Sequence, residues 1–208
     1  SFREYVNKVK WVNIKRYDLA DLVNNYQNIS KEIYDVLWDE TLSLFREYLE
    51  RWYYPFNFES SDKEIYYNKL LWALDKLIYE DISNFYKIES LNLEKLRKII
   101  IFYAFSAPWE LSINALKEKL WLAYDTTVNY LEILQEVWLM KWINVYWVIS
   151  KSIRKAKKIF LDNTNLIFAI HSQTWLNIEK WVLREIFFVN NFSNDLFFSD
   201  KWWDFALN

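Results

Sequence analysis

The sequence contains no glycine in 208 residues, although average usage would place glycine at about 7% of positions. Glycine is the residue that adopts positive φ angles at turns and helix C-caps without steric cost. Tryptophan occurs 13 times, and Trp121, Trp138 and Trp142 stand where a chain commonly places glycine: a predicted turn, a helix end and a hairpin. We therefore expect UGA codons, read as glycine by the organism, to have been translated as tryptophan. A natural tryptophan-rich, glycine-free protein is the alternative.

Cysteine is also absent, which excludes disulfides, thiol catalysis and cysteine metal sites. The single histidine, His171, has no second histidine at metal-ligand spacing, so we expect a surface or core role for it. No apolar run approaches the ~20 residues of a membrane helix and no signal peptide is evident, so we expect a cytoplasmic protein without a membrane partner. The net charge of −2 gives no global basic signal for nucleic acid.

Residues 1–106 have helical periodicity. We predict helices at about 2–9, 18–26, 30–37, 39–51, 62–80 and 92–106. Asp39, Ser61 and Asn92 are the expected N-cap residues. Aromatic residues at helical spacing are predicted to pack in the core or between helices; they include Tyr48, Tyr66, Tyr67 and Phe85.

Residues 107–150 have the pattern of a winged helix-turn-helix. Ser112 is placed to cap a short helix, whose buried face would carry Leu111, Ile113, Leu116 and Leu120. A second helix is predicted to open on Asp125-Thr126-Thr127, with an apolar stripe at Val128, Leu131, Leu134 and Val137. A β-rich segment then carries Leu139, Ile143, Val145 and Val148, enough for a two-stranded wing.

Residues 151–208 begin with a basic cluster and continue as an α/β pattern. The cluster contains Lys151, Arg154, Lys155, Lys157 and Lys158. The pattern predicts strands at 159–161, 196–198 and 205–207 and helices at 166–170 and 178–191.

Six strings, in this order, resemble the C-terminal half of a large prokaryotic family of AAA-type ATPases: SFREYV, FREYLERWYYPF, TTVNYLEIL, KKIFLDNTNLIFAI, WVLREIFFVNNF and WWDFAL. The resemblance implies a helical lid, a winged helix and a C-terminal domain related to restriction endonucleases. Trp52, Trp181 and Trp203 occupy positions where that family has glycine.

The Walker A motif of these ATPases is absent, even when every tryptophan is read as glycine. The resemblance places that motif, with its ATP and Mg²⁺, upstream of Ser1, so we expect a fragment that cannot hydrolyse ATP alone. The expected fold is mainly α: a helical lid and linker at 1–106, a winged helix-turn-helix at 107–150, and a truncated α/β nuclease-like domain at 151–208.

The first functional expectation is a DNA-binding or regulatory module coupled to an upstream ATPase. The residues expected at duplex DNA are Thr126, Thr127, Asn129 and Tyr130 on the second helix, together with the basic cluster. However, no lysine or arginine lies between Tyr124 and Leu139, which weakens phosphate binding by this helix.

Two alternatives stay open. The module could bind a protein, such as a defence or toxin–antitoxin partner, or could self-associate. The third possibility is a metal-dependent nuclease in which Glu185 and Asp204 hold a divalent ion. For these two carboxylates the competing interpretation is a helix-surface glutamate, paired with Arg184 or Arg154, and a turn aspartate. The [DEQ]-x-K segment of nuclease-like folds is absent from the chain.

Overall fold

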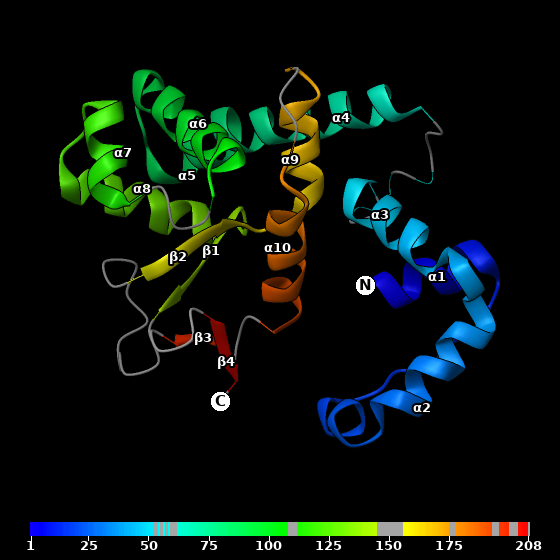
Figure 1. Ribbon diagram of the computed structural model, residues 1–208. Helices are drawn as coiled ribbons and strands as arrows, with labels where there is room; N and C mark the ends of the chain where they lie inside the picture. The colour runs from blue at the N-terminus through cyan, green and yellow to red at the C-terminus, as the bar shows by residue number, and fades with distance from the viewer. Residues whose placement is uncertain are drawn as a thin grey trace. The chain divides into compact units, whose positions relative to one another are not determined.

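The computed structural model describes residues 1–51, 54, 56, 58, 62–107, 112–144, 156–174, 178–192, 196–199 and 204–207. As predicted, the chain is mainly helical (Figure 1). It divides into two compact units, Ser1–Ser61 and Asp62–Asn208. The predicted domain boundaries after residues 106 and 150 both fall inside the second unit.

The first unit consists of α1 (Phe2–Lys10), α2 (Leu19–Leu37), the 3₁₀ turn η1 (Trp38–Glu40) and α3 (Thr41–Arg51). Helix α1 packs on α3 through an aromatic cluster in which the Phe2 ring lies 5.3 Å from that of Phe45 and 5.4 Å from that of Tyr48. The two helices predicted at 18–26 and 30–37 form one helix, α2, with a kink where Asn25 has a φ of −139°. Asp39 lies inside η1 rather than at an N-cap.

The second unit begins with three consecutive helical segments: α4 (Lys63–Lys76), the π-helix η3 (Leu77–Ile82) and α5 (Ser83–Tyr86). Asp62 caps α4, since its Oδ1 accepts hydrogen bonds from the backbone N–H groups of Glu64 at 2.8 Å and Ile65 at 3.1 Å. The predicted cap Ser61 lies outside the described residues. Asn92 lies within α6 (Ser90–Phe105), so the predicted start of that helix was two residues late.

Helices α6, α7 (Ile113–Leu120) and α8 (Tyr124–Glu136) are followed by a hairpin of β1 (Met140–Asn144) and β2 (Ala156–Leu161). Ser112 caps α7 as predicted, because its Oγ accepts from the Ala115 N–H at 3.2 Å. The strands pair antiparallel, with Met140 opposite Leu161 and Trp142 opposite Ile159. The second strand therefore comes from residues predicted to belong to the next domain, and Val145 and Val148 lie outside the described residues.

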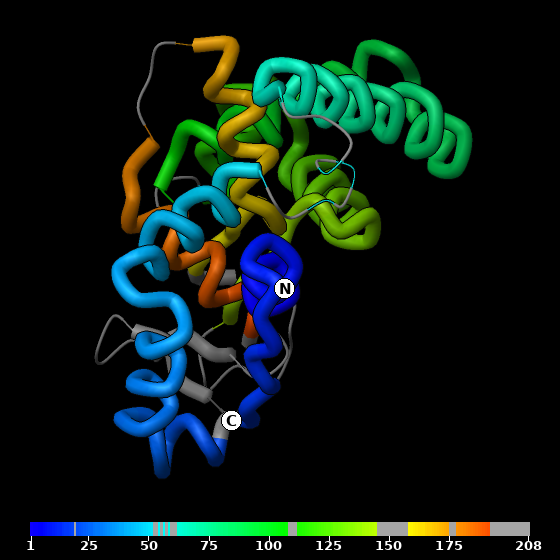
Figure 2. Tube along the Cα trace, turned by 90° about the vertical axis from the view of Figure 1, so that its right-hand side faces the viewer, coloured from blue at the N-terminus to red at the C-terminus, as the bar shows by residue number. Residues whose placement is uncertain are grey.

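Helix α9 (Thr164–His171) lies in the core of the second unit, beside α4 and α6 (Figures 1 and 2). Its apolar residues are mostly buried, and two of its buried polar residues form hydrogen bonds to neighbouring helices. The Tyr66 hydroxyl donates to Asn165 Oδ1 at 2.6 Å, and His171 Nε2 donates to the Ala104 carbonyl at 2.8 Å. His171 was predicted to lie at the surface or in the core, and the structure places it in the core.

Three further elements complete the unit: α10 (Lys180–Phe192), β3 (Leu196–Ser199) and β4 (Asp204–Leu207). Strands β3 and β4 pair antiparallel, with Leu196 opposite Leu207, and β3 lies near β1. These positions match the strands and the helix that the pattern predicted at the C-terminal end.

Five residues have positive φ in the part of the chain that the structure describes: Trp11, Trp38, Lys87, Trp121 and Trp138. The backbone at Trp121 and Trp138 thus has the conformation that favours glycine, as the sequence predicted. Trp142 lies within the paired strand β1 and has no positive φ, so the backbone there sets no requirement for glycine. Trp181 lies within α10 and has no positive φ either, while Trp52 and Trp203 are outside the described residues.

Candidate functional site

The solvent-facing side of α8 carries a row of acidic and amide side chains. Asp125, Asn129, Glu132 and Glu136 are exposed and follow one another at intervals of four, three and four residues. Residues at this spacing share one face of a helix. We call these four residues the acidic α8 row, because three are carboxylates and α8 contains no lysine or arginine.

The residues predicted to contact DNA from α8 are mostly turned inward. Thr127 is buried and its Oγ1 donates to the Ala123 carbonyl at 3.0 Å. Tyr130 is also buried, and burial raises the pKa of its hydroxyl. Thr126 is half-buried, so Asn129 alone of these four is fully exposed.

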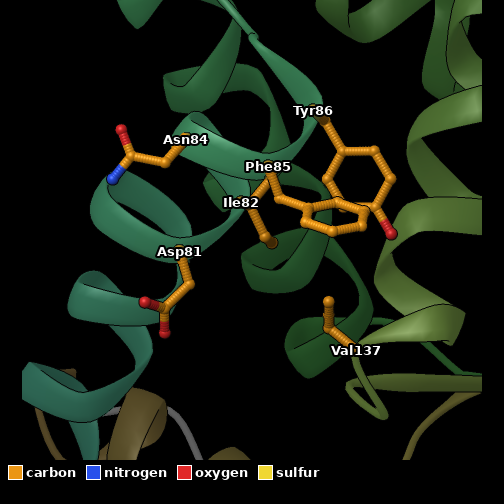
Figure 3. Close-up of a pocket in the computed structure, with 6 residues that line it drawn as sticks. All are labelled: Asp81, Ile82, Asn84, Phe85, Tyr86 and Val137. Atoms are coloured by element: carbon orange, nitrogen blue, oxygen red, sulfur yellow. The ribbon is translucent and has the colours of Figure 1, made fainter.

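A groove of about 590 Å³ opens beside the C-terminal end of α8. It is lined by Asp81, Ile82, Asn84, Phe85, Tyr86 and Val137 (Figure 3). The rings of Phe85 and Tyr86 are in edge contact, with centroids 4.9 Å apart, and Phe85 is 80% exposed. We call this feature the α5–α8 groove.

The groove and the acidic α8 row meet at one hydrogen bond. The Tyr86 hydroxyl on α5 donates to the Glu136 carboxylate at the end of α8. This bond raises the pKa of Tyr86, because the neighbouring negative charge disfavours ionisation of the phenol. Apolar rings and carboxylates therefore belong to one continuous surface.

The groove was not predicted, because Phe85 was expected to pack in the core or between helices; that expectation was wrong, since its side chain is exposed. Tyr48, Tyr66 and Tyr67 are buried as predicted. The difference at Phe85 comes after the π-helix η3, whose i→i+5 hydrogen bonds shift the helical register. Ile78 and Ile82 within η3 are buried, whereas Phe85, three residues later on α5, faces solvent.

The basic cluster contributes one described side chain, and this one is engaged. Lys158 is buried on β2 and donates to the Glu185 carboxylate on α10; the two side chains are 8% and 11% exposed. Its ammonium group is thus bound to a carboxylate rather than presented to solvent. Lys151, Arg154 and Lys155 lie outside the described residues, as does the side chain of Lys157.

A second set of contacts ties the same elements together. Lys141 on β1 forms an ion pair with Asp162 at 2.8 Å, and the Asn190 amide on α10 donates to the Asp162 carbonyl. Burial raises the pKa of Asp162, although Lys141 opposes this effect. The arrangement suits a structural role, since it fastens α10 to the β1–β2 hairpin.

The predicted nuclease pair is only partly described. Glu185 is bound to Lys158 rather than to the anticipated Arg184 or Arg154. Asp204 lies at the start of β4, opposite Ser199, and its side chain is outside the description. The described part of the chain shows no group of three or more histidine, aspartate or glutamate side chains placed to hold a metal ion. The Glu185–Asp204 metal site stays a prediction.

Among the helices that the structure describes, none combines the length and the apolar character that crossing a lipid bilayer requires.

Comparison with known proteins gives a family but no activity. Residues 42–177 match a family described as a domain of unknown function, DUF8612. The chain is 27% identical over 160 residues to the uncharacterized protein MJ1637 of Methanocaldococcus jannaschii, covering 76% of this chain and 34% of that protein. The chain thus spans about a third of the length of this relative. No solved structure matches the chain at a significant level.

Proposed function

This chain belongs to the DUF8612 family of domains of unknown function, and we propose that it is a winged-helix module that binds a partner protein through α8. The order α6, α7, α8, β1, β2 supports this assignment. In it, α7 and α8 form the helix-turn-helix and the β1–β2 hairpin is the wing. The observation that carries the proposal is the negative charge of the acidic α8 row.

A protein partner fits this charge better than duplex DNA does. Affinity for DNA comes largely from cations placed against phosphates, whereas Asp125, Glu132 and Glu136 would repel them. Thr127 and Tyr130 are buried and cannot reach base edges without unpacking α8. DNA binding would then depend on the basic cluster alone, and it is the alternative outcome of the tests below.

The partner that this surface fits is a basic protein segment with one apolar side chain. Its lysines or arginines would face the acidic α8 row, because complementary charge favours association and orients the partner. Its apolar side chain would enter the α5–α8 groove beside Phe85 and Val137. The Tyr86–Glu136 hydrogen bond places both features within one surface.

The charge contribution can be tested with a synthetic helical peptide that carries lysines and one leucine on one face. Glu132→Lys reverses a charge in the acidic α8 row, and Glu64→Lys makes the same change at an exposed position on α4. We expect Glu132→Lys to weaken peptide binding about tenfold and Glu64→Lys to have little effect. Equal weakening by both variants would mean that net charge, and not this surface, attracts the peptide.

The groove can be tested separately. Phe85 is 80% exposed and Leu91, on α6, is 77% exposed, so replacing either with serine removes little packing. Phe85→Ser should weaken binding of the leucine-bearing peptide but not of a peptide with alanine in place of leucine. Leu91→Ser should change neither. If Phe85→Ser leaves the leucine peptide unaffected, the groove does not receive the apolar side chain.

Coupling to an ATPase is a proposal for a longer protein. The resemblance to AAA-type ATPases places ATP and Mg²⁺ upstream of this chain, where turnover would shift the lid and reposition α8 on its partner. The absence of cysteine suits a reducing cytoplasm, in which we propose that the protein acts. The nuclease alternative has less support, because the Lys158 ammonium competes with any metal ion for Glu185.

A further inference from the structure

Tryptophan has an unusual backbone distribution in this chain. The structure describes seven tryptophans, at positions 11, 38, 72, 121, 138, 142 and 181, and four of them have a positive φ angle. Only a few per cent of non-glycine residues have such an angle, and bulky residues are outliers there. The four are Trp11, Trp38, Trp121 and Trp138, each just after the end of a different helix.

Trp121 lies at the centre of a Schellman motif that ends α7. Its φ and ψ are 53° and 49°. Its N–H donates to the Glu118 carbonyl at 3.5 Å, and the Leu122 N–H donates to the Lys117 carbonyl at 3.0 Å. This pair of bonds requires the left-handed conformation at the central position, which is usually glycine because a Cβ atom is disfavoured there.

The same motif ends α8. The Trp138 N–H donates to the Gln135 carbonyl at 2.9 Å, and the Leu139 N–H donates to the Leu134 carbonyl at 2.9 Å. Trp138 has a φ of 60°. Two independent helix ends in one chain thus place tryptophan in the glycine position of one hydrogen-bonding pattern.

The two remaining positions lie in the first unit. Trp11 is left-handed at the end of α1, with φ 54° and ψ 36°. Trp38 follows α2 with φ 49° and ψ −134°, and residues with a Cβ atom rarely occupy such regions. The four side chains are 93%, 71%, 91% and 75% exposed at positions 11, 38, 121 and 138, so packing does not account for their presence.

We infer that these four positions are glycine in the protein as its own cells make it, and that their codons are UGA read as glycine. The backbone at Trp72, Trp142 and Trp181 has no positive φ and therefore does not require glycine. Large exposed aromatic residues commonly mark binding surfaces, but these four mark the ends of helices, so their exposure is no evidence for a contact surface.

The direct test is to read the codons and the native protein. We expect UGA at positions 11, 38, 121 and 138, and we expect tandem mass spectrometry of the protein purified from its own cells to find glycine at each. UGG codons, or tryptophan in the native peptides, would overturn the inference.

A second test uses recombinant protein with the sequence as written and does not depend on the genetic code. Trp121→Gly and Trp138→Gly should each raise the midpoint of thermal unfolding by about 2–4 °C, because they relieve an unfavourable left-handed backbone. Trp72→Gly is the matched control, since Trp72 is also exposed but lies within α4, where glycine lowers stability. If Trp121→Gly and Trp138→Gly lower the midpoint as Trp72→Gly does, the glycine requirement is wrong.

Discussion

Lys158 on β2 and Glu185 on α10 form an ion pair that is almost completely removed from solvent, with 8% and 11% of the two side chains exposed. The two residues are 27 positions apart in sequence. One was expected to contact DNA and the other to hold a metal ion, yet they bind each other. The pair joins the hairpin to the helix that follows α9.

Breaking this ion pair from one side should destabilise the second unit strongly. Lys158→Met leaves the Glu185 carboxylate buried without its cation, and we expect a loss of about 3 kcal/mol in the free energy of unfolding. Replacing both residues, as Lys158→Met with Glu185→Leu, should cost less than the sum of the single changes, because no unpaired charge remains. Urea unfolding of the four proteins measures the coupling, and strictly additive losses would contradict a direct interaction.

The burial of Lys158 also decides which charge changes can test DNA binding by the basic cluster. A Lys158→Glu variant would place two carboxylates together in a buried site, so any loss of DNA binding would reflect unfolding. Lys151→Glu and Lys155→Glu are the informative charge changes in the basic cluster.

The pH dependence of stability should carry a contribution from Asp162. Burial raises its folded-state pKa above the ordinary value of 3.8. The folded state therefore binds this proton more tightly than the unfolded state, and the associated stability is present below pH 3.8 and is lost as pH rises through the folded pKa. In the Asp162→Asn variant the side chain at this position is an amide, which does not ionise, so this contribution is absent.

We expect the stability of Asp162→Asn, relative to the unmodified protein, to increase as pH rises from 3.8 towards neutrality. The slope should not exceed about 1.4 kcal/mol per pH unit, the limit for one proton. Urea unfolding at a series of pH values gives the difference. A difference that stays constant with pH, or that falls as pH rises, would show that the pKa of Asp162 is not raised.

The hydrogen bond between Tyr66 and Asn165 should stabilise the core around α9. Tyr66→Phe removes the donor to a buried amide oxygen 2.6 Å away, and we expect a loss of about 1–3 kcal/mol. Tyr79→Phe removes an equivalent hydroxyl, which donates to Glu94 at 2.5 Å in an exposed setting. The control should lose less than about 1 kcal/mol, since water replaces the lost partner. Equal losses in thermal unfolding would mean that α9 is not anchored through Asn165.

The elements of this fold were largely predictable because they depend on local pattern. The apolar spacing of α7 and α8 and the Ser112 cap are properties of short windows. The structure confirms the cap and the buried positions on both helices, except that Val137 lies just after α8 and is half-buried, and Leu111 is outside the described residues. Asp62 rather than Ser61 caps α4, which is the one-residue uncertainty typical of helix ends.

Long-range pairings were not predictable in the same way. The partner strand of β1 lies beyond residues 145–155, and alternation alone cannot choose between a near strand and a distant one. Lys158 was expected to contact DNA because it belongs to a run of basic residues, but strand pairing and α10 bury it against Glu185. The α5–α8 groove includes residues at and just after the π-helix Leu77–Ile82, an irregularity that single-sequence periodicity does not reveal.

The most direct test of the proposed protein-binding role is a pair of binding titrations at about 50 mM salt, one with a fluorescent duplex DNA of random sequence and one with the lysine-and-leucine peptide. The acidic α8 row predicts saturable peptide binding that Glu132→Lys weakens. For DNA we expect a Kd above about 10⁻⁴ M, the weak end of ordinary non-specific affinity. Tight, steeply salt-dependent DNA binding that is lost in Lys151→Glu with Lys155→Glu, without peptide binding, would contradict the proposal and assign the module to DNA.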